Sequence, residues 1–198
     1  EGKETLHNVT DLKTISNKGL FVTLRCQKDG LYLYESENLH DYKSKGIHAF
    51  RACVHSNAAQ WASRKAKWRV IDNKTHYMVQ SVYRDAYLFD TDSYTTFEYK
   101  GIKSSYVATH NLAYQWSDDS KTKPRWILQP IQGQNACFAL KSSWRDSYLF
   151  ASDQATGYID SQQNASFFAH GHPKALDWKN GAAIWRLDVV AEWRSYLE

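Results

Sequence analysis

Apolar and polar residues alternate in short runs along this sequence, and one such run occurs three times, at residues 21–34, 77–89 and 138–150. Each copy starts at an aromatic residue, alternates, reaches an aspartate followed by a small residue, and ends in Tyr-Leu-aromatic. A period of two is typical of a half-buried strand, and aspartate beside a small residue is typical of a tight turn. Each copy therefore predicts a β-hairpin.

Two further blocks follow every hairpin in the same order. The pattern His-x-x-Ala-x-[Gln/Asp]-Trp occupies residues 55–61, 110–116 and 172–178, and it begins 23 or 24 residues after the hairpin tyrosine. A Trp-x-aliphatic strand then follows at 68–70, 126–128 and 185–187. This spacing divides the chain into repeats at 21–76, 77–137 and 138–190, each with about four short strands.

Three such repeats resemble the β-trefoil, and the resemblance covers residues 21–190. It implies an all-β protein in which three repeats with pseudo-threefold symmetry share one core, as a six-stranded barrel capped by three hairpins. Residues 1–20 are then an N-terminal extension. Residues 191–198 are a C-terminal tail whose composition is compatible with a helix.

Composition agrees with one β-rich domain and excludes some partners. The 198 residues suit a single core, and an aromatic content of 15% with only 3 prolines favours strands. Lysine and arginine exceed aspartate and glutamate by only 25 to 21, so we expect no nucleic-acid partner. No apolar run is long enough to cross a bilayer, so we expect no membrane insertion.

Sequence features at the surface favour secretion. Glycosylation acceptor patterns begin at Asn8, Asn73 and Asn164, and the chain begins at Glu1 rather than at methionine. The expected location is therefore extracellular.

Three cysteines allow one disulfide at most. Cys26 and Cys53 lie in the same repeat, so we predict a bond between them. Cys137 is expected to be a small core residue.

Threefold recurrence has both structural and functional explanations. Large apolar residues on strands are normally buried, so one repeated set is assigned to the core: Leu33, Leu88, Leu149, Trp68, Trp126 and Trp185. The aspartates at the hairpin turns, Asp29, Asp85 and Asp146, either stabilise the turns or accept hydroxyl hydrogen bonds from a sugar.

The repeated His-to-Trp segment is the main candidate for a binding site. Indole and imidazole rings offer flat apolar faces with polar edges, which suits a sugar ring surrounded by hydroxyls. The candidate ligand-binding residues are His55, Gln60, Trp61, His110, Gln115, Trp116, His172, Asp177 and Trp178. The alternative is that the indoles plug the open end of the barrel while the histidines bond to backbone. A site of three histidines around a metal has much weaker support, because this spacing does not define a ligand geometry.

Additional aromatic residues suggest a second platform. Tyr83 and Trp144 occupy equivalent places just before Arg-Asp at a hairpin tip, and more aromatics are present than one core requires.

No sequence motif of catalysis or cofactor binding occurs, so we expect neither an enzyme nor a cofactor. The favoured function is a secreted lectin with up to three glycan sites, whose partners are glycans or glycoproteins. The Gln-x-Trp motif of ricin-type lectins is absent, since Ala66, Pro124 and Ala183 stand two places before the core tryptophans. The hairpin strands are more similar to those of arabinofuranose-binding trefoil modules.

Two other functions remain open. The first is a protein-binding trefoil, such as a protease inhibitor or a cytokine-like ligand. The second is an actin-bundling module similar to those of fascin, which the glycosylation patterns disfavour. Single-loop binders lose their loop symmetry, and the persistence of the loop motif here favours the lectin. The sequence does not define the oligomeric state.

Overall fold

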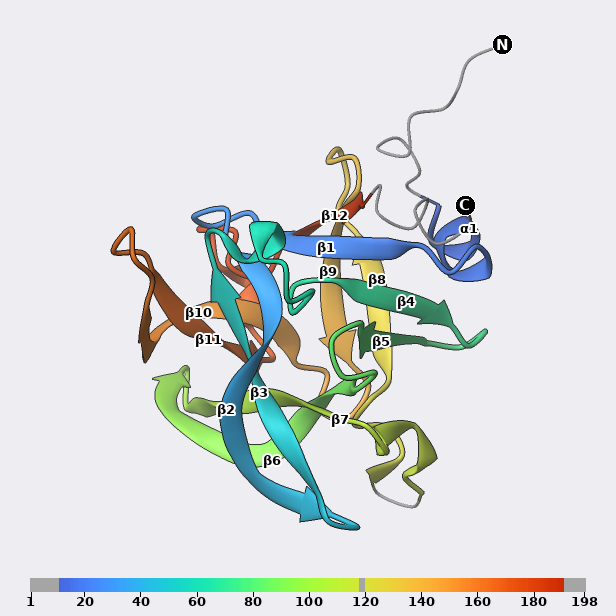
Figure 1. The fold of residues 1–198 in the computed structure, drawn as a ribbon, viewed down its shortest axis with the longest axis horizontal. Coiled ribbons are helices and arrows are strands. Elements are labelled where there is room, and N and C mark those ends of the chain that lie inside the picture. The colour runs from blue at the N-terminus through green and yellow to red at the C-terminus, as the bar shows by residue number, and fades with distance from the viewer. Residues whose placement is uncertain (1–10, 118–119, 191–198) are drawn as a thin grey trace.

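The computed structural model describes residues 11–117 and 120–190, which form β-structure together with one short α-helix, α1 (Leu12–Asn17) (Figure 1). Each repeat contributes four strands, as the sequence predicts. The first has β1 (Phe21–Cys26), β2 (Tyr32–Ser44), β3 (Ile47–His55) and β4 (Trp68–Asp72). The second has β5 (Tyr77–Ser81), β6 (Tyr87–Tyr99), β7 (Ile102–His110) and β8 (Trp126–Pro130). The third has β9 (Cys137–Ser142), β10 (Tyr148–Ile159), β11 (Ala165–His172) and β12 (Trp185–Val189).

Six of these strands close into a barrel. β1 pairs with β4, β4 with β5, β5 with β8, β8 with β9, β9 with β12, and β12 with β1, all antiparallel. Because the series of pairs returns to its first strand, these six barrel strands have no free edge.

The other six strands form three long hairpins that cap one end of the barrel. β2 pairs with β3, β6 with β7, and β10 with β11. The second strands of the hairpins also pair with one another, β3 with β7, β7 with β11, and β11 with β3, which closes a triangle. A six-stranded barrel with a three-hairpin cap is the predicted β-trefoil architecture, so the predicted fold class is confirmed.

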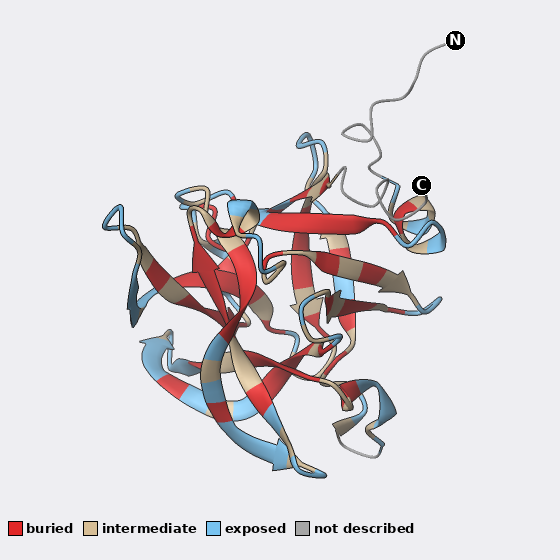
Figure 2. Ribbon diagram, in the orientation of Figure 1, coloured by how far each residue is buried: buried red, intermediate tan, exposed pale blue. Residues whose placement is uncertain are grey.

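The core is built from the residues that the repeat pattern assigned to it. Trp68, Trp126 and Trp185 are at most 1% exposed, and each indole Nε1 donates to a backbone carbonyl on the first hairpin strand of its own repeat. The repeated leucines are fully buried beside them. Figure 2 shows that burial is concentrated along the barrel strands, whereas the hairpin tips are exposed.

Residues before the first repeat also contribute to the core. Asp11 caps α1, because its Oδ1 accepts from the backbone N–H of Lys13. Ile15 and Leu20 are buried within the main apolar cluster, so the packed part of the chain begins before residue 21. Residues 1–10 and the tail 191–198 lie outside the described residues.

The predicted disulfide is absent, and that prediction is wrong. Cys26, Cys53 and Cys137 are free thiols. Cys26 lies on barrel strand β1, where its Sγ is 3.4 Å from the carbonyl oxygen of Ala182, whereas Cys53 lies on cap strand β3 opposite Tyr34. Burial raises the pKa of each of these two thiols to about 12. Membership of one repeat did not place the two cysteines together, because β1 and β3 belong to different layers.

The structure also places Cys137, predicted as a core residue, and two of the predicted glycosylation acceptors. Cys137 is partly exposed rather than a core residue. Asn73 is exposed in the turn between β4 and β5, whereas Asn164 is half-buried and its Nδ2 donates to Asp160 Oδ2 over 3.4 Å. Asn8 lies outside the described residues. Glycosylation at these positions stays a prediction, with Asn73 the more accessible of the two described acceptors.

Candidate functional site

The three repeated histidines are structural. His55 is fully buried, its Nε2 donates to the carbonyl oxygen of Asn164 over 3.1 Å, and its Nδ1 accepts from the backbone N–H of Asn57 over 3.0 Å. The other two repeats reproduce both bonds. The residues in those bonds are His110 with Ile47 and Leu112, and His172 with Ile102 and Lys174. Each ring therefore fastens its own loop to the hairpin of another repeat and has no nitrogen left for a ligand.

The repeated indoles, in contrast, are half-buried. A 3-10 turn precedes each of them: η2 (Ala58–Gln60), η3 (Ala113–Gln115) and η5 (Ala175–Asp177). Trp61, Trp116 and Trp178 each meet an aromatic ring of the cap edge-to-face, with centroids 4.8 or 4.9 Å apart. These cap rings are Tyr34, Phe89 and Phe150. The indoles are therefore neither sealed in the barrel nor free at the surface.

A second aromatic ring reaches each indole from a different repeat. Tyr158 of the third repeat lies 6.0 Å from Trp61, between ring centroids and edge-to-face. In the same way Tyr42 of the first repeat lies 5.6 Å from Trp116, and Phe97 of the second lies 5.8 Å from Trp178. These added rings are 40–47% exposed. The aromatic rings of each site therefore come from two repeats, and the site is open on one side.

A shift in strand register turns a polar segment toward each indole. The pairing of β2 with β3 is interrupted between Glu35 and Leu39, and the equivalent interruption occurs in β6 and β10. Ser36 Oγ holds the shifted segment, because it donates to the Arg51 carbonyl and accepts from the N–H of Asn38. Thr91 and Ser152 make the same pair of bonds in the other repeats. Such irregularities redirect side chains away from the sheet.

The residue at the centre of each shifted segment is a carboxylate that meets lysine or arginine. Glu37 lies 3.1 Å from Lys65 Nζ and 2.5 Å from Arg84 Nη2. Burial works against ionisation of Glu37, but hydrogen bonds from Lys65 and Tyr83, together with the charges of Arg84 and Lys65, outweigh it and lower its pKa below the usual value. The equivalent pairs are Asp92 with Lys123 at 2.6 Å and Arg145 at 3.3 Å, and Asp153 with Lys28 at 2.6 Å.

These features surround three cavities, which we call the Trp61, Trp116 and Trp178 pockets. Their volumes are about 410, 150 and 410 Å³. Each is lined by its indole, its cap ring, the ring from the other repeat, two or three Ser or Thr residues, one carboxylate of the shifted segment and one lysine. Amide side chains also line two of them, Asn38 in the Trp61 pocket and Gln154 and Asn180 in the Trp178 pocket.

Several predicted ligand residues lie elsewhere. Gln60, Gln115 and Asp177 are exposed on the 3-10 turns and line none of the three pockets. The hairpin-tip aspartates Asp29, Asp85 and Asp146 have φ of 62°, 53° and 56°, a left-handed conformation that aspartate tolerates in turns. The structure therefore favours the turn interpretation of these aspartates over the sugar-binding one.

The hairpin tips still contribute to the pockets through the residues before those aspartates. Arg84, Arg145 and Lys28 each extend to the pocket carboxylate of another repeat. Tyr83 Oη donates to Glu37 over 3.0 Å, and Lys123 Nζ lies 4.9 Å from the centre of a Trp144 ring. The predicted hairpin-tip platform is thus the rim of two pockets rather than a separate surface.

Sequence reasoning missed the pocket carboxylates, although a signal for them exists. Glu37, Asp92 and Asp153 each stand five residues after the hairpin tyrosine. An acidic residue at one offset in all three repeats is the same kind of evidence that identified the histidines and tryptophans.

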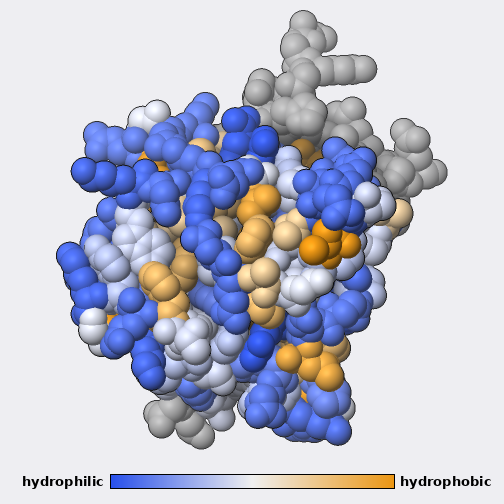
Figure 3. Space-filling model, turned by 90° about the vertical axis from the view of Figure 1, so that its left-hand side faces the viewer, coloured by the Kyte–Doolittle hydropathy of each residue, from blue (hydrophilic) through white to orange (hydrophobic). Residues whose placement is uncertain are grey.

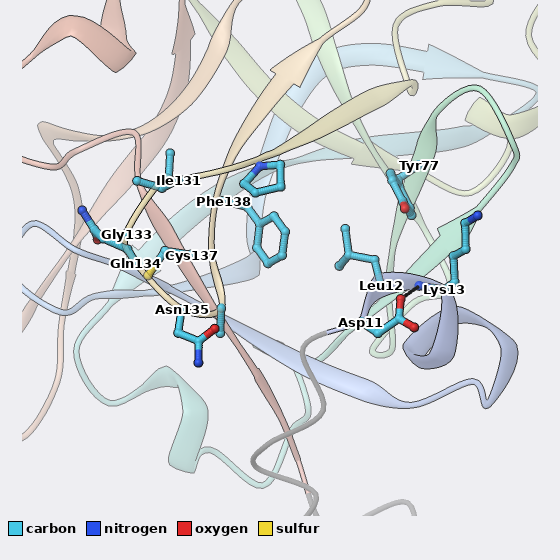
Figure 4. A pocket seen from close by; sticks show the side chains of 12 residues that line it. Asp11, Leu12, Lys13, Tyr77, Ile131, Gly133, Gln134, Asn135, Cys137 and Phe138 are labelled. Atoms are coloured by element: carbon cyan, nitrogen blue, oxygen red, sulfur yellow. Dashed lines mark hydrogen bonds between the residues drawn. The ribbon is translucent and has the colours of Figure 1, made fainter.

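Other features of the described residues do not form a second site of this kind. No group of three or more His, Cys, Asp or Glu side chains in residues 11–117 and 120–190 has the arrangement of a metal site. Within the same residues no helix is long and apolar enough to cross a membrane. A further cavity of about 700 Å³ lies between the start of α1 and the β8–β9 turn, where Leu12, Tyr77 and Phe138 face one another (Figure 4). It contains none of the predicted ligand residues.

Comparisons with known proteins find similarity in structure but not in sequence. No protein-family model matches the chain, and no curated protein matches it. The designed three-fold symmetric protein ThreeFoil superposes with a TM-score of 0.58 at 13% identity, over 86% of this chain and 99% of its own. The fold is a β-trefoil.

Natural proteins share this trefoil at similarly low identity. A salivary protein of the cysteine and tryptophan-rich family from Culex quiquefasciatus has a TM-score of 0.55 at 15% identity, over 86% of this chain and 93% of its own. The ricin B-like lectin of Macrolepiota procera, solved with lactose, has a TM-score of 0.51 at 12% identity, over 86% and 95%. At these identities the likeness establishes the trefoil fold and not the ligand.

Proposed function

We propose that this protein is a secreted lectin that binds carbohydrate in the Trp61, Trp116 and Trp178 pockets. The observation that carries the proposal is the threefold recurrence of one pocket, in which an indole, a cap ring and an exposed ring from another repeat lie beside hydroxyl side chains, a carboxylate and a lysine. A purely structural role requires the indole and the cap ring, but it does not require an exposed third ring or a polar rim in every copy.

The chemistry of these pockets suits a sugar ring. The half-buried indole and the exposed ring from the other repeat present apolar faces that pack against the C–H face of a pyranose or furanose. Around them the carboxylate accepts hydrogen bonds from sugar hydroxyls, and the lysine donates to hydroxyl oxygens. The indole Nε1 of Trp116 and of Trp178 is buried without a partner among the described residues, which leaves one more donor beside each of these two pockets.

Comparison supports this class of function without defining the ligand. The Macrolepiota lectin was solved with lactose, and it shares the trefoil over most of both chains. The salivary origin of the Culex protein agrees with an extracellular location. Our proposal is a binding protein that uses no cofactor, because neither the sequence motifs nor the pocket residues supply a catalytic arrangement.

A protein-binding function is the competing proposal. The face of the molecule in Figure 3 carries mainly hydrophilic side chains with small, separate hydrophobic groups between them. Protein-binding surfaces have an apolar centre that is continuous rather than divided in this way. Three similar pockets also suit a clustered glycan, because several weak sites on one rigid body bind with an avidity roughly 10²–10⁴ times that of a single site.

A glycan array with pocket variants tests the proposal. The triple variant Trp61→Ala, Trp116→Ala and Trp178→Ala should reduce binding to background. Because these indoles are half-buried, a second triple variant, Tyr42→Ala, Phe97→Ala and Tyr158→Ala, removes only exposed rings and should also weaken binding.

Tyr114→Ala provides the matched control for these variants. Tyr114 is an aromatic residue that is 52% exposed and lines none of the three pockets. Its variant should bind like the wild type. Thermal unfolding of every variant reports whether the fold is retained. The proposal is wrong if the wild type binds no glycan, or if folded triple variants bind as well as Tyr114→Ala.

A further inference from the structure

Every lysine that lines the three pockets is already paired with a carboxylate of the same pocket. Lys65 lies 3.1 Å from Glu37, Lys123 lies 2.6 Å from Asp92, and Lys28 lies 2.6 Å from Asp153. From these pairs we propose that the pockets select neutral saccharides and reject sulfated, sialylated or other anionic ones. This inference rests on the proposed lectin function and defines its ligand class.

The arginines that border the pockets are paired in the same way. In the Trp61 pocket Arg84 donates to Glu37 over 2.5 Å and to the fully buried Glu35 over 2.9 Å. The two cations Lys65 and Arg84 therefore face two carboxylates. No positive charge of this group is left over for an anionic ligand.

The Trp116 pocket has as many carboxylates as cations. Asp92 accepts from both Lys123 and Arg145, at 2.6 and 3.3 Å. The pocket is lined in addition by Asp41, so the two cations Lys123 and Arg145 are matched by two carboxylates. The Trp178 pocket is simpler, because Lys28 and Asp153 form one balanced pair.

These pairs act differently on neutral and charged ligands. A sugar hydroxyl both donates and accepts, so one hydroxyl can donate to the carboxylate while another accepts from the ammonium group, and the pair stays intact. A sulfate or carboxylate group accepts only. To reach the lysine it must displace the bound Glu or Asp, and it then lies beside a carboxylate of like charge, which is costly at close range.

The test compares paired glycans on one array. Neutral oligosaccharides ending in galactose, glucose, mannose or N-acetylhexosamine are printed beside their sulfated or sialylated counterparts. The wild type should bind the neutral member of a pair roughly tenfold more strongly, which corresponds to about 1.4 kcal/mol.

Asp92→Asn is the informative variant, because it releases two cations at once and the Asp92 side chain is 63% exposed. It should narrow or reverse the preference against anionic glycans. Asp188→Asn is the matched control, since it changes net charge equally while its partner Arg186 lies on β12 and lines none of the three pockets. This control should retain the wild-type preference.

The possible results separate the inference from the proposal beneath it. Preference of the wild type for anionic glycans overturns the inference but leaves the lectin function standing. The same holds if Asp92→Asn and Asp188→Asn bind the paired glycans equally. If no glycan of either kind binds the folded wild type, both the lectin function and the inference are refuted.

Discussion

The carboxyl group of Asp90 should make the folding stability of this trefoil depend on pH. Asp90 is fully buried, and its Oδ1 accepts from Ser105 Oγ over 2.6 Å, whereas its Oδ2 has no partner among the described residues. In the first repeat the equivalent Glu35 reaches Arg84 directly over 2.9 Å. Aspartate is shorter by one methylene, and Arg145 Nη1 is likewise buried without a described partner.

The pKa of Asp90 sets the size and the sign of this effect. Burial raises the pKa from 3.8 to about 6, against the opposing effects of the Ser105 hydroxyl and Arg145. The folded state therefore holds a proton that the unfolded chain has already lost at pH 5. The contribution of Asp90 to the free energy of unfolding is therefore fully present below pH 4 and is lost as pH rises through 6. A shift of about 2 units corresponds to about 3 kcal/mol in the free energy of unfolding.

The perturbation is Asp90→Asn, which keeps the side-chain shape but does not ionise. Urea unfolding of wild type and variant between pH 4 and pH 8 gives the difference in their free energies of unfolding. As pH rises across this range, the wild type should lose about 3 kcal/mol of its free energy of unfolding relative to the variant. Asp29→Asn, at an exposed hairpin tip, controls for the change in net charge. Parallel pH profiles for wild type and Asp90→Asn would refute the reasoning.

Two further substitutions test buried residues. Burial, together with Arg51, lowers the pKa of His170 to about 3, so its contribution to stability is present above pH 6.5 and is lost as pH falls. His170→Cys introduces the residue found at the equivalent position 53. At pH 5 the variant should gain about 2 kcal/mol in the free energy of unfolding, because it removes the cost of keeping a buried histidine neutral. An unchanged urea midpoint at pH 5 would contradict this. Trp126→Phe deletes the 2.9 Å bond to the Leu88 carbonyl and should cost about 2–4 kcal/mol, measured by thermal unfolding; a cost below about 1 kcal/mol would show that the bond contributes little.

The sequence was sufficient to predict the fold because each repeat carries the same pattern of strand and turn residues. The alternating runs predicted the strands of each hairpin, and the left-handed aspartates agree with the tight turn expected between them. Trp68, Trp126 and Trp185 recur at the first position of a barrel strand in each repeat, where they fill the shared core. Because the same pattern occurs three times, each copy supports the strand and core assignments made for the other two. These assignments therefore required no knowledge of which residues are in contact.

The same repetition could not distinguish residues with a structural role from residues that line a pocket. His55 and Trp61 stand six residues apart in one motif, yet the histidine bonds to backbone on both nitrogens while the indole lines a pocket. The predicted bond between Cys26 and Cys53 failed for a related reason, because one repeat spans both the barrel and the cap.

Only the tertiary structure decided which side chains meet. The Trp61 pocket combines an indole of the first repeat with Tyr158 of the third, and its carboxylate Glu37 binds Arg84 of the second. Periodicity along a chain indicates which side chains share a face of a strand, since that depends on backbone geometry, and the apolar set marks the buried face. It carries no information on contacts across the pseudo-threefold axis, because those depend on how the repeats pack together. The fold was therefore determined within each repeat, and the pockets were determined between repeats.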